Sequence, residues 1–541
     1  MKNNFFNKIL AVALAAVMLF SMTSCEFFDN LFGEKQPELP PVVDPIDDDY
    51  RTFYQIFVES FADGSGDTVG DLRGIIENFD YLNDGNINSG KSLGVQGIWL
   101  SPIFSSPSYH KYDTTNYYEI DWRFGVERDL VELVELCHSR NVKIILDLAI
   151  NHTSNQHEWF LQFKQARINN DTSNKYYDYY SCATATTQVN GRQYQKIAGI
   201  DCYYECNFTG DMPELNYDNP EVRQEMLNVA KHYLDLGIDG FRFDAIKYIY
   251  YGDTTKSVAF WEWYMKELRK YKPDIYAVGE CWSGDTEVIR YYGAMNCFNF
   301  TTSSTSGTIA SVAKGSASVY SYANYLEKYQ DSIQAKNPDA MVMSFLSNHD
   351  MDRIAGTFIN DNFMKMAANL YLLCSGSPVI YYGEELGMCG SRGAEATDAN
   401  RRLAMLWGNS YTPRNPVGTT YPEKNQIKTT VADQKEDANS LYNYYCRLIA
   451  IRHKHPEIAR GDYKAIQCGN SKLGGFLVKY NGSYVVIIHN TSTAEVTYDL
   501  SRCAALAGMS VTELCDYIGV GEANLNGTML TISGQTSVIL K

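Results

Sequence analysis

The sequence lacks a basic excess. Its 541 residues include 47 lysines and arginines against 64 aspartates and glutamates, which gives a net charge of −17. Nucleic-acid binding depends on a basic surface that neutralises phosphates, so we expect no nucleic-acid partner. The rest of the composition, 45% hydrophobic and 21% charged residues, is that of a globular protein with a large core.

Paired cysteines of the metal-binding kind are also missing. The chain has 13 cysteines, but none form a C-x-x-C pair and no histidines cluster with them. A zinc site is therefore not expected. Cys182, Cys202 and Cys206 lie in one loop-rich stretch and could include a disulfide, but sequence alone does not determine which two would pair.

The apolar run at the N-terminus is too short to span a bilayer comfortably. Residues 9–20 (ILAVALAAVMLF) follow Lys2 and Lys8 and precede the small residues of SMTSC (21–25), which predicts a secretory signal over residues 1–25. Cys25 resembles the lipidated cysteine of bacterial lipoproteins, although Met22 stands where leucine is usual; plain secretion is the alternative. Residues 26–50, rich in proline and acidic residues, are predicted to form a flexible tether.

Short apolar runs recur between amphipathic stretches such as 127–140 and 221–237. Alternation of this kind is typical of parallel strands joined by crossover helices. Eight such runs favour a closed (β/α)8 TIM barrel, with a doubly wound open sheet as the alternative. The runs are residues 53–58, 95–100, 143–148, 238–244, 275–280, 296–300, 341–346 and 378–383.

Two further domains are predicted from breaks in this alternation. The interval after the third run is too long for one helix, so residues 153–212 are expected to form a small inserted domain. After a last helical stretch at about 438–455 the pattern changes to short strands such as 474–492, which predicts a C-terminal antiparallel β-sandwich over 459–541. The barrel then comprises residues 51–152 and 213–458.

Polar side chains interrupt the apolar runs at corresponding ends. In a barrel of this type the active site gathers where the strands end. One aspartate at a strand end is often only a helix cap or an ion-pair partner, but coincidences on four strands make that reading improbable. We therefore expect three carboxylates to converge with an arginine and two histidines. The residues concerned are Asp147, His152, Arg242, Asp244, Glu280 and SNHD (347–350).

Six segments resemble those of the α-amylase family of glycoside hydrolases (family 13 type). LDLAINH (146–152), GFRFDAIKY (240–248), VGECW (278–282) and FLSNHD (345–350) resemble its four signature regions; MPELN (212–216) resembles a fifth, and YYGEELGM (381–388) the usual last strand. The signal, tether and layout also resemble surface lipoprotein amylases of Gram-negative starch-utilisation systems. That resemblance implies an outer-membrane location through the lipid anchor and other glucan-binding surface proteins as partners.

The resemblance implies a role for each catalytic carboxylate. Asp244 would be the nucleophile that forms a glycosyl-enzyme, Glu280 the acid/base, and Asp350 the stabiliser of the oxocarbenium-like transition state. Arg242 would keep Asp244 ionised, because a nearby positive charge lowers a carboxylate pKa. The resemblance further implies substrate contacts from His110, Tyr112, His152, Arg242, Lys247, His349 and Arg353.

The predicted activity is retaining, endo-type hydrolysis of α-1,4 bonds in starch and malto-oligosaccharides. An α-1,6-acting oligosaccharidase, a neopullulanase or a transglycosylase of the same fold is the alternative. Ala245 follows Asp244, where α-1,6-specific relatives often carry valine, and this favours α-1,4. A non-catalytic glucan-binding protein is a third reading, but such relatives lose members of the carboxylate trio, and here all three are present.

A calcium site is predicted in DGSGDTVGD (63–71). Alternating oxygens on a Gly-rich loop can wrap a hard cation, although Thr68 and Gly74 rule out an EF-hand. Calcium-binding amylase relatives have this spacing, which implies a structural Ca²⁺; an acidic turn without metal is the alternative. A second calcium between barrel and insert is not predicted, because Tyr248 replaces the usual histidine. The expected ligands are the side chains of Asp63, Ser65, Asp67 and Asp71 and the carbonyl of Val69.

Overall fold

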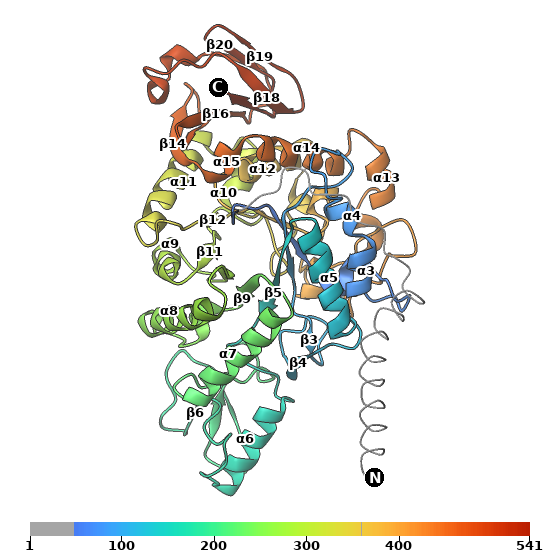
Figure 1. Ribbon diagram of the computed structural model, residues 1–541, viewed down its shortest axis with the longest axis vertical. Helices are drawn as coiled ribbons and strands as arrows, with labels where there is room; N and C mark the ends of the chain where they lie inside the picture. Colours follow the sequence, from blue (N-terminus) through green and yellow to red (C-terminus); the bar gives the residue numbers. More distant parts are fainter. Residues whose placement is uncertain (1–47, 359) are drawn as a thin grey trace, which may run out of the picture. The chain divides into compact units, whose positions relative to one another are not determined.

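The computed structural model describes residues 48–358 and 360–541 (Figure 1). The predicted signal, Cys25 and tether residues 26–47 lie outside this range. The last tether residues, Asp48 to Tyr50, contact the barrel: Arg460 Nε lies 2.5 Å from Asp48 Oδ2, and Ser377 Oγ donates to the Asp49 carbonyl at 2.9 Å. Within the described ranges, none of the helices combines the length and the apolar character that crossing a bilayer requires.

The predicted (β/α)8 barrel is confirmed. Eight parallel strands pair in the order β12-β11-β10-β9-β5-β2-β1-β13. The ring closes where Phe345 bridges to Val379 and the Val379 amide donates to the Ser344 carbonyl at 2.8 Å. The strands are β1 (Phe53–Ile56), β2 (Gly97–Leu100), β5 (Lys143–Leu148), β9 (Gly240–Phe243), β10 (Tyr276–Gly279), β11 (Asn296–Phe298), β12 (Val342–Met343) and β13 (Val379–Tyr381).

The helices lie outside the strand ring (Figure 1) and bury one apolar face each. In α5 (Glu127–Ser139) the buried residues are Leu130, Leu133, Val134 and Cys137, the spacing of one helical face. The other helices between barrel strands are α2 (Val58–Phe61), α3 (Leu72–Glu77), α4 (Phe79–Leu82), α7 (Pro220–Asp235), α8 (Thr254–Tyr271), α9 (Asp285–Val288), α10 (Thr308–Ala313), α11 (Val319–Gln334) and α12 (Asp361–Leu372). After β13 come α13 (Val431–Glu436), α14 (Leu441–Lys454) and α15 (Pro456–Arg460).

Side chains fill the interior of the barrel. Phe53, Trp99, Ile145, Tyr276 and Val278 belong to one buried cluster and come from four of the strands, β1, β2, β5 and β10. Successive strand residues point to opposite sides, so the alternate positions face the helices. Packing of this kind makes the barrel a core rather than a pore, and leaves room for polar groups only towards the carboxyl ends of the strands.

The insert lies between β5 and α7. It contains α6 (Glu158–Asn169) and a three-stranded antiparallel sheet in the order β6-β8-β7. Isolated bridges between His152 and Glu214 and between Tyr180 and Leu215 hold its base. The sheet strands are β6 (Cys182–Ala183), β7 (Tyr194–Lys196) and β8 (Tyr203–Glu205), and a separate hairpin after β2 is formed by β3 (Phe104–Ser105) and β4 (Asn116–Ile120).

Two antiparallel sheets form the predicted C-terminal sandwich. One has the order β14-β15-β16-β21-β18 and the other β17-β20-β19, with a buried apolar layer that includes Leu477, Ile488 and Ile532. Asn369 of α12 joins this region to the barrel, since its amide donates to the Ile518 carbonyl at 3.1 Å and to Ser537 Oγ at 2.9 Å. The strands are β14 (Asp462–Gln467), β15 (Leu473–Tyr480), β16 (Ser483–Asn490), β17 (Val496–Asp499), β18 (Leu514–Gly519), β19 (Ala523–Asn526), β20 (Met529–Ile532) and β21 (Thr536–Leu540).

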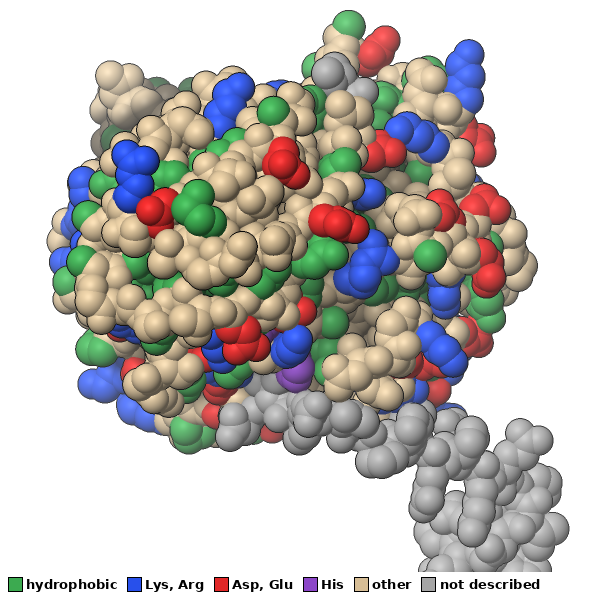
Figure 2. All heavy atoms as spheres, turned by 90° about the horizontal axis from the view of Figure 1, so that it is seen from above, with side chains coloured by type: hydrophobic (Ala, Val, Ile, Leu, Met, Phe, Trp, Pro, Cys, Tyr) green, Lys and Arg blue, Asp and Glu red, His purple; other side chains and the backbone are tan. Residues whose placement is uncertain are grey.

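The acidic excess is not gathered into one patch on the face that Figure 2 shows, where acidic and basic side chains are interspersed. Several basic side chains are paired, as Arg73 is with Asp129 and Glu132 at 2.9 and 2.7 Å. Exposed pairs of this kind contribute only about 0–1 kcal/mol each. The buried apolar clusters, rather than these pairs, therefore hold the fold together.

Candidate active site

Arg242 joins two carboxylates at the carboxyl ends of β5 and β9. The parallel register places Arg242 opposite Asp147, and its Nη1 donates to Asp147 Oδ1 at 2.8 Å and to Asp244 Oδ1 at 2.5 Å. The guanidinium is fully buried and lies 5.1 Å from the ring centre of Trp99. Burial raises the pKa of Asp147 to about 7, and Arg242 opposes that shift. The arginine thus supplies the positive charge that a buried pair of carboxylates requires.

Glu280 follows β10 and lies beside this pair. Its Oε2 accepts a hydrogen bond from the Ala245 amide at 2.8 Å and lies 3.8 Å from Arg242 Nη2. Ala245 has φ of 49°, in the left-handed region, so the chain turns sharply after Asp244. Burial raises the pKa of Glu280 to about 7; Arg242 opposes the shift, and the charges of Asp244 and Asp350 add to it. A carboxyl group with this pKa can both give and take a proton near neutral pH.

Asp350, after β12, is held in the ionised form. Arg402 Nη2 lies 2.8 Å from Asp350 Oδ1, and His349 Nε2 lies 3.0 Å from Oδ2. Burial acts to raise the pKa of Asp350, but His349 and Arg402 outweigh it and hold the pKa well below its usual range. Asp350 therefore offers a fixed negative charge, in contrast to Glu280.

The tautomer of His349 follows from its neighbours. Gln55 Nε2 donates to His349 Nδ1 at 2.8 Å, which leaves Nε2 to carry the proton that faces Asp350. Burial lowers the pKa of His349, so the ring is a neutral donor. The Tyr112 hydroxyl lies 2.6 Å from the same Nε2 and donates to Asp147 Oδ2 at 2.9 Å. Tyr112 and His349 thus link the carboxylate of Asp147 to that of Asp350.

Four aromatic rings lie together on this side of the site. Tyr112 stacks on His349 with ring centres 5.3 Å apart and planes 6° from parallel. His152 Nε2 lies 3.1 Å from the Tyr112 carbonyl, and the Tyr112 amide donates to His110 Nδ1 at 3.2 Å. Burial lowers the pKa of His152 and lowers that of His110 to about 4. Both histidines are therefore neutral hydrogen-bonding groups at neutral pH.

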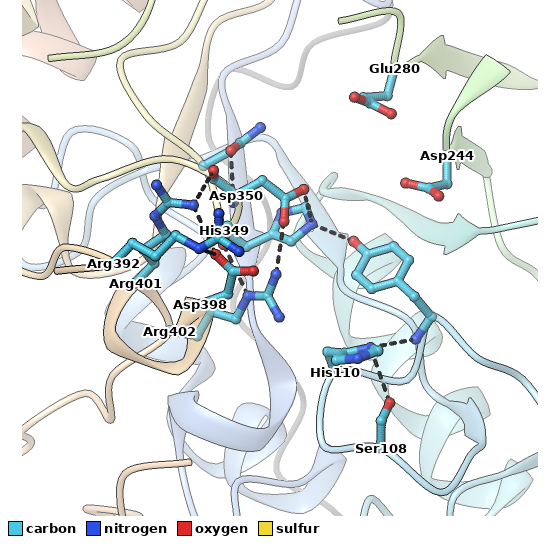
Figure 3. Close-up of polar contacts among 12 residues, drawn as sticks. Ser108, His110, Asp244, Glu280, His349, Asp350, Arg392, Asp398, Arg401 and Arg402 are labelled. Carbon is cyan, nitrogen blue, oxygen red and sulfur yellow. Dashed lines mark hydrogen bonds and ion pairs between the residues drawn. The ribbon is translucent and has the colours of Figure 1, made fainter. Parts of the chain in front are cut away.

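These groups open into one cleft of about 1000 Å³. In Figure 3 the carboxylates of Asp244 and Glu280 point towards the space beside Asp350. Trp282, 46% exposed, stacks on Phe300 with ring centres 5.1 Å apart and offers a flat apolar surface. Lys247 Nζ donates to the Trp282 carbonyl at 2.7 Å. The lining also includes Tyr109, His110, Tyr112, His152, Phe208, Thr209, Met212, Ala245, Tyr248, Arg392, Ala396, Thr397, Asp398, Arg401 and Arg402.

Seven of the ten predicted catalytic and substrate-binding residues line this cleft, and Arg242 and His349 contact its carboxylates Asp244 and Asp350. Arg353 meets the cleft only through the backbone of Arg401. Arg353 is buried, and its Nη1 donates to the Tyr382 carbonyl at 2.7 Å and its Nε to the Arg401 carbonyl at 3.0 Å. Through these two bonds Arg353 holds the backbone at Tyr382 and Arg401 in place. The arginines at the cleft are instead Arg392, Arg401 and Arg402. They come from a loop without strand or helix periodicity, so the pattern of apolar runs gave no signal for them.

The predicted calcium loop is folded around two buried carboxylates. Asp63 accepts from the amides of Gly66 and Thr68 at 2.6 and 2.8 Å, and Asp71 accepts from those of Ser65 and Gly74 at 2.9 and 2.6 Å. Burial raises the pKa of Asp71. In the part of the chain that the structure describes, no lysine, arginine or histidine nitrogen lies within 4.0 Å of Asp63, Asp67 or Asp71.

The donor set of this loop is compatible with a hard cation. Its oxygens come from carboxylates, a hydroxyl and a carbonyl, the ligands that Ca²⁺ prefers. Among the described residues, no basic side chain pairs with its buried carboxylates. Across residues 48–358 and 360–541, clusters of three or more His, Cys, Asp or Glu side chains arranged to hold a metal are not found. In this arrangement the carboxylates of the loop bind backbone amides instead of converging on one point.

Comparison with known proteins relates this chain to the alpha-amylase family. The family model for the alpha amylase catalytic domain matches residues 55–461. Alpha-amylase 3 of Dictyoglomus thermophilum is 34% identical over 437 residues, 80% of this chain and 82% of that protein. A 4-alpha-glucanotransferase of Thermotoga neapolitana is 29% identical (78% and 94% of the two chains), and an oligo-1,6-glucosidase of Bacillus cereus is 28% identical (79% and 88%).

Comparison with solved structures gives the same family. Eubacterium rectale Amy13B superimposes with a TM-score of 0.84 at 34% identity, covering 93% of this chain and 97% of that one. The match extends over the barrel, the insert and the C-terminal sheets together, because it leaves out only a small part of either chain.

Proposed function

The chain belongs to the alpha-amylase catalytic-domain family, and from this premise we propose that it hydrolyses internal α-1,4-glucosidic bonds of starch and malto-oligosaccharides with retention of configuration. The observation that carries the proposal is the pairing of unlike carboxylates in one cleft. Asp244 accepts a hydrogen bond from Arg242 at 2.5 Å, whereas burial raises the pKa of the neighbouring Glu280 to about 7. An ionised nucleophile beside a protonated acid is what a retaining glycosidase needs.

The proposed reaction has two steps. In the first, Asp244 attacks the anomeric carbon while Glu280 gives its proton to the leaving oxygen, and a glycosyl-Asp244 intermediate forms. In the second, Glu280 takes a proton from water, which attacks the same carbon and releases the sugar. Arg242 would orient Asp244 for the attack, because its Nη1 donates to Asp244 and to the buried Asp147.

Asp350 would stabilise the positive charge that develops on the sugar ring in the transition state. Its pKa stays well below the usual range, through His349 and Arg402, so its negative charge is present throughout the reaction. His152 and His349 would hold sugar hydroxyls as neutral donors, and Tyr112 would stack against the ring. Preorganised charges of this kind supply most of the rate enhancement in many enzymes.

A matched pair of variants tests the assignment. Asp244→Asn keeps the volume and removes the nucleophile, so we expect turnover of starch to fall about 10⁴-fold or more, with the melting temperature and glucan binding largely kept. Asp211→Asn, on the exposed surface of the insert, is the control and should leave turnover unchanged. Near-normal activity of the Asp244 variant would refute the nucleophile role.

An α-1,6-acting or transferring enzyme is the second candidate, and the relatives named 4-alpha-glucanotransferase and oligo-1,6-glucosidase favour it. Chromatography of products from starch, pullulan and isomaltose separates the candidates. Endo-type α-1,4 hydrolysis predicts mixed malto-oligosaccharides from starch before glucose accumulates, and little reaction with isomaltose. Rapid cleavage of isomaltose, or products longer than the substrate, would favour the second candidate.

We propose also that the loop 63–71 holds a structural Ca²⁺. Asp63, Ser65, Asp67 and Asp71 and the Val69 carbonyl would be its ligands. The support is the pair of buried carboxylates in one short loop, Asp63 and Asp71, 5% and 3% exposed. The ion would brace the loop after β1 without taking part in the reaction.

Export and anchoring are proposed from the first 25 residues. Residues 1–25 would direct secretion, Cys25 would carry the lipid after cleavage, and the tether would hold the catalytic part at the outer surface of a Gram-negative cell. The support is the order of charged, apolar and small residues that ends in Cys25. Starch and its fragments would reach the enzyme there from the medium.

A further inference from the structure

The register of the three-stranded sheet in the insert brings three cysteines to one face of two paired strands. β6 pairs with β8 so that Cys182 lies opposite Tyr204. Residues two apart on extended chain point to the same side, so Cys202 and Cys206, on either side of Tyr204, are both diagonal neighbours of Cys182. Diagonal neighbours are within reach of each other's side chains. The register thus leaves two candidate partners for Cys182.

The contacts of the side chains distinguish between the two. Cys202 is the thiol that acts on Cys182, since each of the two is the largest cause of the shift in the other's pKa. Cys206 is influenced by the carboxylates of Glu205 and Glu214 rather than by a thiol, and burial raises its pKa to about 11. Cys202 is therefore the expected partner of Cys182, while Cys206 is a buried thiol that does not pair.

The surroundings favour reaction at Cys182. The hydrogen bond from Cys202 lowers the pKa of Cys182 to about 7, and the positive charge of Arg167 adds to that shift. The thiolate is the reactive form of cysteine, and Cys182 is also only half-buried, whereas Cys202 is 8% exposed. An oxidant from solvent would thus meet Cys182 first.

We propose that Cys182 and Cys202 form a disulfide by exchange with an external disulfide, either a small molecule or a disulfide oxidoreductase. The Cys182 thiolate attacks one sulfur of the oxidant, which releases a thiolate and leaves a mixed disulfide. Cys202, after losing its proton, attacks Cys182 Sγ and releases the second thiolate. The two cysteine protons pass to the two released thiolates, so one dithiol is oxidised as one disulfide is reduced.

The bond would constrain a segment that borders the cleft. It closes the loop 183–201, in which Arg192 Nη1 donates to Glu205 Oε2 at 3.0 Å and Nη2 to the Tyr251 carbonyl at 2.6 Å. Residues 189–192 line a groove of about 530 Å³ together with Lys247, and Lys247 also lines the active-site cleft. Closing the loop reduces the freedom of the unfolded chain and fixes this wall of the groove.

Peptide mapping tests the assignment directly. The full chain is equilibrated with oxidised glutathione, its remaining thiols are alkylated, and the digest is analysed by mass spectrometry before and after reduction. We expect one linked peptide pair that joins Cys182 to Cys202, with Cys206 alkylated. A Cys182–Cys206 or Cys202–Cys206 link, or glutathione on Cys182 without an intramolecular bond, would overturn the proposal.

Matched serine variants give a second readout. The wild-type chain should melt a few degrees higher after oxidation than after dithiothreitol, and Cys206→Ser should keep that difference. Cys182→Ser and Cys202→Ser should lose it, with melting temperatures that no longer depend on the redox state. Loss of the difference in Cys206→Ser, or its persistence in Cys182→Ser, would contradict the pairing even if one variant is itself less stable.

Discussion

At the scale of single residues, the site depends on the charge of Arg242. Burying a carboxylate without a partner costs several kcal/mol, and this one guanidinium, fully buried, binds both Asp147 and Asp244. The same side chain interrupts an otherwise apolar strand, which explains the pattern GFRFD. Asp147 contributes no reaction step in this scheme; it orients Arg242 and accepts from Tyr112 and Trp99.

The first prediction concerns pH and Glu280. Its acid role requires the protonated form, and burial raises its pKa to about 7. As pH rises above that value the group loses its proton, so kcat/KM should fall about tenfold per pH unit on the alkaline side. The measurement is a pH profile of kcat/KM between pH 5 and 9 on a malto-oligosaccharide.

Glu280→Gln is the control for this profile. The variant cannot titrate at this position, so its remaining activity should lack the alkaline fall near pH 7. Substrates with good leaving groups need little protonation and should be hydrolysed with a smaller loss than starch. An unchanged alkaline limb in the variant would assign the titration to another group.

At this scale the sequence predicts the positions of residues at strand ends, but not those of residues on loops. Asp147, Arg242 and Glu280 follow from their place at the ends of strands, which must converge in a barrel. Arg402 binds Asp350 but was not predicted; Arg353, which was, supports backbone carbonyls behind the site. Both are arginines outside any periodic segment, and only tertiary packing decides which of them reaches the cleft.

At the scale of elements, the loop 63–71 between α2 and α3 carries a prediction about stability. A cation that binds only the folded chain stabilises it by about 2.7 kcal/mol when present at a hundredfold excess over Kd. Chelation should therefore lower the melting temperature while initial turnover at 25 °C stays nearly unchanged, because the loop is not placed at the cleft. The measurement is thermal unfolding with and without EDTA, combined with elemental analysis for calcium.

Asp67→Ala is the variant for this test. It removes one proposed ligand but keeps Asp71, which caps α3 through the Gly74 amide. It should melt at the lower temperature and respond no further to EDTA, whereas Glu119→Ala, an exposed acidic residue of β4, should behave as the wild type. An EDTA-insensitive wild type that contains no calcium would leave the loop as an acidic turn.

The secondary-structure elements themselves were largely predictable. All eight apolar runs became barrel strands, and the amphipathic stretches 127–140 and 221–237 became α5 and α7. The signal was strong because parallel strands buried on both faces need continuous apolar runs. The insert was predictable only as an interval without that pattern, and the pairing of its β6 and β8, which brings Cys182 near Cys202 and Cys206, required the structure.

At the scale of the whole molecule, the N-terminal 25 residues carry the prediction about location. Expressed in a Gram-negative host with labelled palmitate, the full chain should incorporate label and sediment with membranes. Cys25→Ser should lose both properties, while Cys515→Ser, a matched change in the C-terminal region, should keep them. Label that remains in the Cys25 variant, or a wild-type chain found only in the soluble fraction, would refute the anchor.

The central claim is that this chain breaks glucosidic bonds through a covalent intermediate on Asp244. Mass spectrometry of the enzyme trapped with a 5-fluoro-α-glucosyl fluoride tests it most directly, since fluorine slows release of the intermediate more than its formation. The account predicts one added fluoroglucosyl group, located on Asp244 in the peptide that contains residues 240–248. A label on Glu280 or Asp350, or an active enzyme that cannot be trapped and releases product of inverted configuration, would contradict it.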